Sequence, residues 1–150
     1  MTRNAILALA LVLVAYAPMA GQPQQPTIDV YKSATCGCCS KWVEHLKSNG
    51  FTVRTTNRED LAEFKAAHGV PRRVQSCHTA IVDGYVIEGH VPASDVQRLL
   101  KEKPAILGLA VPGMPIGSPG MEVSGRGAQP FDVTAFDKDG RTRVFASHGK

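Results

Sequence analysis

Residues 28–50, IDVYKSATCGCCSKWVEHLKSNG, join a short apolar segment to an amphipathic one through a loop rich in cysteine. Residues 28–31 predict a strand, and residues 40–49 predict a helix whose apolar face begins at Trp42. Gly50 suits the end of that helix, because glycine readily takes the left-handed conformation found there. Three of the chain's four cysteines lie between these two elements, so the local fold gathers thiols at one point.

The segments that follow predict an alternation of strands and helices. They are a strand at residues 51–55, a helix that begins near Asn57 and Asp60, strands at residues 79–82 and 85–88, and a helix after Pro92. Asp83-Gly84, between the last two strands, is a hairpin turn signal. The resulting order β-α-β-α-β-β-α, with the cysteines after the first strand, predicts an α/β protein with a thioredoxin-like fold.

The chain changes character after Pro104. Residues 108–120 are so rich in glycine and proline that we expect neither a regular helix nor a strand there. Residues 131–136 and 142–145 flank the turn signal Asp139-Gly140 and predict a C-terminal β-hairpin. The chain therefore ends in a Gly/Pro-rich loop and a hairpin that extend the α/β unit.

The N-terminal segment is typical of a secretory signal peptide. Arg3 supplies a positive charge, and residues 5–17 form an uninterrupted apolar stretch of 13 residues. That stretch is shorter than the about 20 residues that a membrane-spanning helix needs. An uncleaved membrane anchor is the alternative. We expect export to the periplasm, no membrane association after cleavage, and a compartment in which disulfides persist.

Charge and composition argue against a nucleic-acid partner. The formal net charge is +4, the basic residues are scattered, and Arg72-Arg73 is their only adjacent pair. Aromatic residues make up 6% of the chain and are not interleaved with the basic ones. A nucleic-acid surface needs a clustered basic patch, so the sequence does not support this class of function.

The segment Cys36-Gly37-Cys38-Cys39 carries the chemistry. Free N–H groups at a helix N-terminus lower the pKa of thiols placed there. Cys36 and Cys39 are three residues apart, so both can face the same side of the first turn. Three interpretations are open: a structural disulfide with spare thiols, a redox pair of Cys36 and Cys39, and a site for a soft metal. The extra thiol of Cys38 exceeds what a redox pair needs, which favours the metal.

Cys77 lies just before the strand predicted at residues 79–82. In thioredoxin-like folds this place faces the cysteine loop and usually holds a cis-proline, whereas here it reads Ser76-Cys77-His78. We expect a fourth sulfur over the cluster; a cysteine buried in the core is the alternative. Neighbours in a regular strand face opposite ways, so Cys77 and His78 serve one site only if the backbone is irregular.

Further soft donors stand near these cysteines in the sequence. His78 and His90 are candidate additional ligands or supporting residues, and Met114 and Met121 bring thioether sulfur from the Gly/Pro-rich loop. Thiolate and thioether donors together select monovalent copper over hard cations. Structural roles for the histidines, and gap-filling packing for the methionines, are the alternatives. We interpret His45 as structural.

Four motifs in order resemble the CopG-type periplasmic copper-resistance proteins, long catalogued as an uncharacterised metal-binding family with a thioredoxin-like fold. They are CGCC at 36–39, SCHTA at 76–80, EGHVP at 88–92 and GLAVPGMPIGSPGME at 108–122. The resemblance implies copper handling in the periplasm, and cysteine sulfur as the metal ligand. On this chain those ligands are Cys36, Cys38, Cys39 and Cys77.

The resulting hypothesis is an exported copper-binding protein for copper resistance and homeostasis, with redox activity on the metal as an extension. A periplasmic thiol–disulfide oxidoreductase using Cys36 and Cys39 is the alternative, so enzymatic activity is left open. Delivery of copper to another periplasmic copper-handling protein is a third role. The predicted organisation is a signal peptide at 1–20, a spacer at 21–26, a thioredoxin-like metal-binding domain at 27–104, and the loop and hairpin of 105–150 packed on the same domain.

Overall fold

The structure, a computed structural model, describes residues 26–149. The signal peptide predicted at residues 1–20 lies outside the described residues, as does the spacer up to residue 25, and both stay predictions. Within residues 26–149, no helix has the length and apolar character needed to cross a bilayer.

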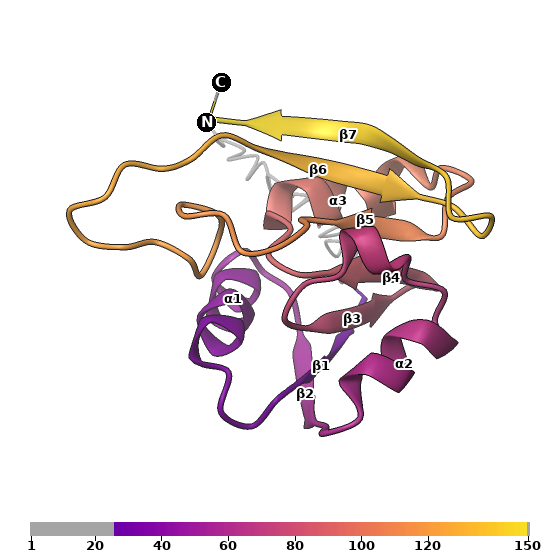
Figure 1. Ribbon diagram of the computed structural model, residues 1–150, viewed down its shortest axis with the longest axis horizontal. Helices are drawn as coiled ribbons and strands as arrows, with labels where there is room; N and C mark the ends of the chain where they lie inside the picture. Colours follow the sequence, from indigo (N-terminus) through magenta and orange to yellow (C-terminus); the bar gives the residue numbers. More distant parts are fainter. Residues whose placement is uncertain (1–25, 150) are drawn as a thin grey trace, which may run out of the picture.

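The described chain forms one seven-stranded sheet with helices on both faces (Figure 1). The strands are β1 (Ile28–Lys32), β2 (Val53–Asn57), β3 (Thr79–Val82), β4 (Tyr85–Glu88), β5 (Gly108–Ala110), β6 (Phe131–Phe136) and β7 (Thr142–His148). The helices are α1 (Gly37–Ser48), α2 (Leu61–Ala67) and α3 (Ala93–Glu102), with a short 3-10 helix at Arg72–Val74. The prediction of a mixed α/β protein is confirmed.

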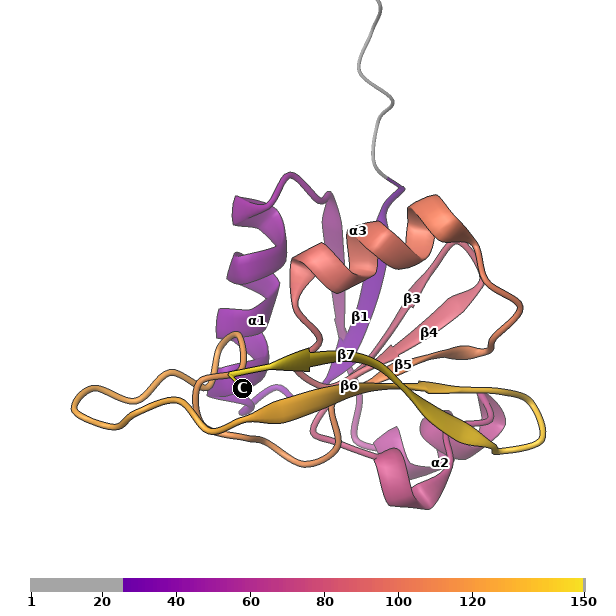
Figure 2. The same cartoon turned by 90° about the horizontal axis from the view of Figure 1, so that it is seen from above.

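The strand order in the sheet is β2-β1-β3-β4-β5-β6-β7. β1 is parallel to β2 and antiparallel to β3, and β4 is antiparallel to β3 and parallel to β5. Helices α1 and α3 cover one face of the sheet and α2 the other (Figure 2). Neighbouring residues of a strand serve opposite faces: Ile87 joins the core under α1 and α3, whereas Val86 joins a smaller cluster with Val74.

The loop between β1 and α1 is shorter than expected, because the helix begins at Gly37 rather than Ser40. Cys36 is the N-cap residue, and its carbonyl oxygen accepts a hydrogen bond from the backbone N–H of Ser40 at 3.3 Å. Cys38 and Cys39 consequently lie within the first helical turn. Trp42 and Leu46 on the following turns are fully buried against the sheet and anchor that turn.

Helix α3 is held to α1 at its start. Its N-cap residue, Pro92, supplies no capping side chain, so the backbone N–H of Ala93 finds an acceptor elsewhere. Nε2 of His45 on α1 accepts that N–H at 3.0 Å. Because Nε2 acts as the acceptor, the imidazole is neutral, and burial lowers its pKa below the usual value. His45 thus has the structural role expected of it.

Two further expectations about local structure are wrong. Residues 108–110 form the strand β5, because Gly108 lies so close to the carbonyl oxygen of Val86 that any Cβ would collide with it. Glycine there permits a strand rather than preventing one. Asn57 belongs to β2, where it pairs with Lys32, so α2 begins only at Leu61 after Asp60.

The C-terminal hairpin continues the sheet beyond β5. β6 pairs with β5 and β7, and β7 runs to His148, three residues further than expected. Helix α3 supports it: Arg98 donates to the carbonyl oxygen of Phe145 at 2.7 Å, and Asp95 lies 2.7 Å from Nε2 of His148. Residues after 104 thus share a sheet with those before it. The domain boundary at 104 stays a prediction.

Candidate metal centre

The cysteines of the first helical turn are in two chemical states. A disulfide joins Cys36 to Cys39, whose Cα atoms are 5.4 Å apart, and Cys38 is a free thiol. Sγ of Cys38 lies 3.5 Å from Sγ of Cys36. Cys39 is fully buried, while Cys36 and Cys38 are half-buried. Both free and bonded sulfurs therefore gather at the start of α1.

The segment before β3 brings the fourth sulfur to this group. The sulfur atoms of Cys36, Cys38, Cys39 and Cys77 all lie within 4.8 Å of one another. Such a spacing is short enough for sulfurs that share one metal ion or bridge two, since metal–sulfur bonds are about 2.3 Å long. The convergence expected from the sequence is therefore present in the fold.

Cys77 also belongs to a second group, made with two histidines. Its Sγ lies 3.2 Å from Nδ1 of His78 and 3.1 Å from Nε2 of His90. The three ligand atoms lie within 4.8 Å of one another. Cys77 and His78 precede the first residue of β3, so the regular alternation of a strand does not force them apart. Sγ of Cys77 is thus the ligand atom common to both groups.

The hydrogen bonds of His90 fix which of its nitrogens can bind a metal. Nδ1 lies 2.7 Å from the carbonyl oxygen of Pro119. A carbonyl oxygen only accepts, so Nδ1 carries the proton and Nε2 presents its lone pair toward Sγ of Cys77. A backbone carbonyl that orients a histidine through its other nitrogen is the usual support of a metal-binding imidazole.

His78 is a buried imidazole with one unused nitrogen. Its side chain is 0% exposed, and among the described residues its Nε2 is the buried side-chain N or O atom without a hydrogen-bond partner. The ring lies against Trp42, with centroids 4.3 Å apart. Burial, then the nearby His90 and Lys65, lower the pKa of His78 well below its usual value. It is therefore neutral, as a metal ligand must be.

The free thiol of Cys77 is protonated at neutral pH in the metal-free protein. Burial, followed by the neighbouring Cys38, raises the pKa of Cys77 to about 11. Metal binding would displace that proton, because only the thiolate is a ligand. The donor set of thiols and neutral imidazoles fits a soft or borderline metal ion.

The Gly/Pro-rich loop, residues 111–130, lies against the cysteine turn. Pro119 accepts from His90, and a Cβ at Gly120 would stand 2.8 Å from both the carbonyl oxygen of Cys38 and the backbone nitrogen of Trp42. Met121 follows directly and is half-buried, whereas Met114 is 52% exposed. A ligand role for the two methionines stays a prediction.

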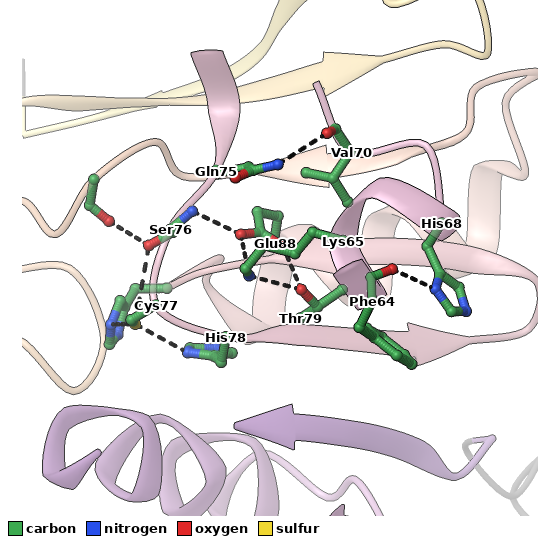
Figure 3. Close-up of polar contacts among 12 residues, drawn as sticks. Phe64, Lys65, His68, Val70, Gln75, Ser76, Cys77, His78, Thr79 and Glu88 are labelled. Atoms are coloured by element: carbon green, nitrogen blue, oxygen red, sulfur yellow. Dashed lines mark hydrogen bonds and ion pairs between the residues drawn. The ribbon is translucent and has the colours of Figure 1, made fainter. Parts of the chain in front are cut away.

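A buried polar network lies behind the site (Figure 3). Nζ of Lys65 on α2 donates to Oε1 of Glu88 at 2.6 Å and to Oγ1 of Thr79 at 2.8 Å. Glu88 also accepts from Thr79 and from the backbone N–H of Ser76, each at 2.6 Å. Burial raises the pKa of Glu88, and Lys65 opposes that shift.

Sequence reasoning assigned no role to this network. Lys65 on a short helix looks like an ordinary solvent-facing residue, and nothing in the sequence reveals its burial. Glu88 offered a signal, since a carboxylate ends the apolar strand run YVIE directly before Gly89-His90. A buried carboxylate of that kind requires partners, and the partners come from elements far away in the sequence.

Comparisons with known proteins agree with the geometry. Residues 74–121 match the family described as "Protein of unknown function, DUF411". Two solved structures, "Copper resistance protein copG- Form 1" and "Copper resistance protein copG- Form 2", are each 42% identical to this chain, with a TM-score of 0.78. The matches cover 84% and 83% of this chain, respectively, and 99% of each of those chains. No match was found among curated protein sequences.

The chain therefore belongs to the CopG family of copper resistance proteins. The resemblance seen in the four sequence motifs is confirmed by these matches.

Proposed function

We propose that this protein binds monovalent copper through two groups of donors that share Sγ of Cys77. The first group is the four sulfurs of Cys36, Cys38, Cys39 and Cys77, and the second is Cys77 with His78 and His90. The shared sulfur is the observation that carries the proposal, because a bridging thiolate lets one site hold more than one ion. Soft thiolate donors select monovalent copper, and the related copper resistance proteins support this choice of metal.

The redox state of the cysteines controls how many donors are free. A disulfide sulfur is not a thiolate, so the four-sulfur group is complete only after two electrons open the Cys36–Cys39 bond. The group of Cys77, His78 and His90 contains no disulfide sulfur and stays available in the oxidised protein. Copper capacity is therefore linked to the reducing power around the protein.

The proposal includes a thioredoxin-like architecture and an exported protein. Support for the architecture comes from the cysteine turn between β1 and α1, the parallel pair of β1 and β2, and the antiparallel pair of β3 and β4. Support for export to the periplasm comes from the apolar residues 5–17 after Arg3. Cell fractionation and the mass of the mature chain test export; a full-length chain retained in the cytoplasm would contradict it.

A titration of reduced, metal-free protein with monovalent copper under anaerobic conditions tests the binding proposal. Competition with a coloured chelator of known affinity gives both affinity and stoichiometry. We expect wild type to bind more ions, and more tightly, than a Cys36→Ser/Cys39→Ser variant. A His68→Ala variant is the control, because His68 lies on the other side of the sheet against Phe64. Equal binding by wild type and the double variant would refute the proposal.

One observation favours thiol–disulfide exchange as a second candidate function. The Cys36–Cys39 disulfide stands at the start of α1, with one sulfur half-buried and the other fully buried. Reduction of insulin by the metal-free protein tests it. Turnover that survives the replacement of Cys38 and Cys77 by serine would favour the oxidoreductase.

A further inference from the structure

Glu88 joins the two chain segments that carry the donors Cys77 and His90. The side chain of Glu88 is 0% exposed, and its Oε1 accepts the backbone N–H of Ser76 at 2.6 Å (Figure 3). Ser76 directly precedes Cys77, and Glu88 itself lies two residues before His90. One carboxylate therefore ties the backbone of the first segment to the second at the level of the metal centre.

The segment that carries Cys77 and the segment that carries His90 make further contacts beside the hydrogen bond between Glu88 and Ser76. The backbone N–H of Gly89 donates to the carbonyl oxygen of His78 at 3.0 Å. Gly89 has φ of 71°, and a Cβ there would collide with the side chain of Ser76. The side-chain hydroxyl of Ser76 in turn donates to the carbonyl oxygen of Gly113 in the loop. A shift of Ser76 would therefore disturb its contacts with Glu88, Gly89 and Gly113.

Both oxygens of the Glu88 carboxylate accept hydrogen bonds. Lys65 donates to Oε1 and Thr79 donates to Oε2, each at 2.6 Å, and the side chain of Lys65 is 6% exposed. Burying such an ion pair costs desolvation energy that often equals or exceeds its attraction, so it is weak support for overall stability. The contact with the Ser76 amide reaches the residue before Cys77, and the contact with Thr79 reaches the residue after His78.

We propose that Glu88 is a positioning residue of the metal centre, which holds the Ser76 amide and thereby sets Sγ of Cys77 between Nδ1 of His78 and Nε2 of His90. Lys65 and Thr79 orient the carboxylate for this task. The inference rests on the proposed function, because it concerns the same donors. Metal–ligand distances tolerate errors of only about 0.2 Å, so a small displacement of Cys77 weakens binding.

Three variants separate positioning from stability. In Lys65→Met/Thr79→Val/Glu88→Leu, apolar side chains of similar size replace the buried network, so the fold is retained while the carboxylate is lost. Glu88→Gln keeps an oxygen that can still accept the Ser76 N–H. Val133→Ala opens a cavity at a fully buried position of β6, a strand that carries none of the proposed ligands, and controls for loss of stability alone.

Two measurements are made on each reduced protein. The first is the affinity for monovalent copper by chelator competition, and the second is the rate at which iodoacetamide alkylates Cys77 in the metal-free protein, followed by mass spectrometry. We expect the triple variant to lose about 10–100-fold in affinity, as for other residues that support a ligand, and to show faster alkylation of Cys77. Glu88→Gln should lose less on both measures, and Val133→Ala should lower the melting temperature alone.

Copper affinity and Cys77 alkylation unchanged in a folded triple variant would overturn the inference, and so would equal losses in Val133→Ala. If wild type itself binds no copper, the proposed function fails. The alkylation rate of Cys77 still decides whether Glu88 holds that residue in place, so the two failures are distinguishable.

Discussion

Nε2 of His90 faces Sγ of Cys77 at 3.1 Å, with the opposite ring nitrogen committed to the carbonyl oxygen of Pro119. In the metal-free protein the proton of the Cys77 thiol can occupy the space between the two atoms. A metal ion that replaces this proton meets a thiolate and a fixed imidazole lone pair at once.

Replacing Cys77 should weaken both groups of donors, because they share its Sγ atom. We expect Cys77→Ala to lower the number of bound monovalent copper ions and to weaken the remaining binding at least about tenfold. Anaerobic chelator competition measures both quantities. His68→Ala should bind as wild type does, and a Cys77→Ala variant with unchanged stoichiometry would show that the bridge is not used.

Oxidised protein should bind fewer copper ions than reduced protein. The Cys36–Cys39 disulfide removes two thiolates, whereas Cys77, His78 and His90 remain. Metal-to-protein ratios after gel filtration, with thiols counted in the same samples, provide the measurement. In a His90→Phe variant the residual binding of the oxidised form should fall further. Equal ratios in the two redox states would contradict this expectation.

Substitution of Gly120 should loosen the contact between the Gly/Pro-rich loop and α1. Gly120 has φ of 85° and lacks room for a Cβ, whereas Gly125 has φ of 77° with open space around it. Both alanine variants lose about 1–2 kcal/mol of folding stability to the left-handed backbone, and Gly120→Ala loses about 1–3 kcal/mol more to the collision. Urea unfolding of the two proteins gives the difference. Similar losses of stability in both variants would mean that the loop moves away from α1 without cost.

Acidification should weaken the metal-free protein partly through His45. Folding lowers the pKa of His45 from 6.5, so the unfolded chain takes up the proton first as the pH falls. The stability from its neutral imidazole is therefore present above pH 6.5 and lost below it. Urea unfolding at pH 7.5 and 5.5 should show a smaller drop for His45→Gln, whose amide does not titrate. Equal losses of stability in wild type and His45→Gln would show that His45 does not contribute to the pH dependence.

Much of the fold could be predicted from the sequence where the pattern of apolar residues and the turn signals agree. Residues 79–82 and 85–88 are strands as expected, because short apolar runs flank the turn signal Asp83-Gly84. Both turn residues have positive φ, which suits a tight hairpin. The strand at residues 131–136 was likewise expected and found.

The errors arose where tertiary contacts override local preference. Gly108 reads as a strand breaker until the carbonyl oxygen of Val86 is seen beside it. The expected convergence of the cysteines relied on a motif and is present. By contrast, the partnership of Lys65 with Glu88 spans 23 residues and leaves no local pattern that sequence reasoning can detect. The tautomer of His90 likewise depends on a carbonyl 29 residues away.

The unequal burial of the two bonded sulfurs gives the disulfide a direction. An incoming thiolate can approach the half-buried Cys36 but not Cys39, whose side chain is 0% exposed. Attack at Cys36 expels Cys39 as the leaving group, because exchange proceeds through a mixed disulfide on the sulfur that is attacked. A mixed disulfide formed by opening this bond, whether with glutathione or with another protein, is therefore carried on Cys36 and released by the thiolate of Cys39.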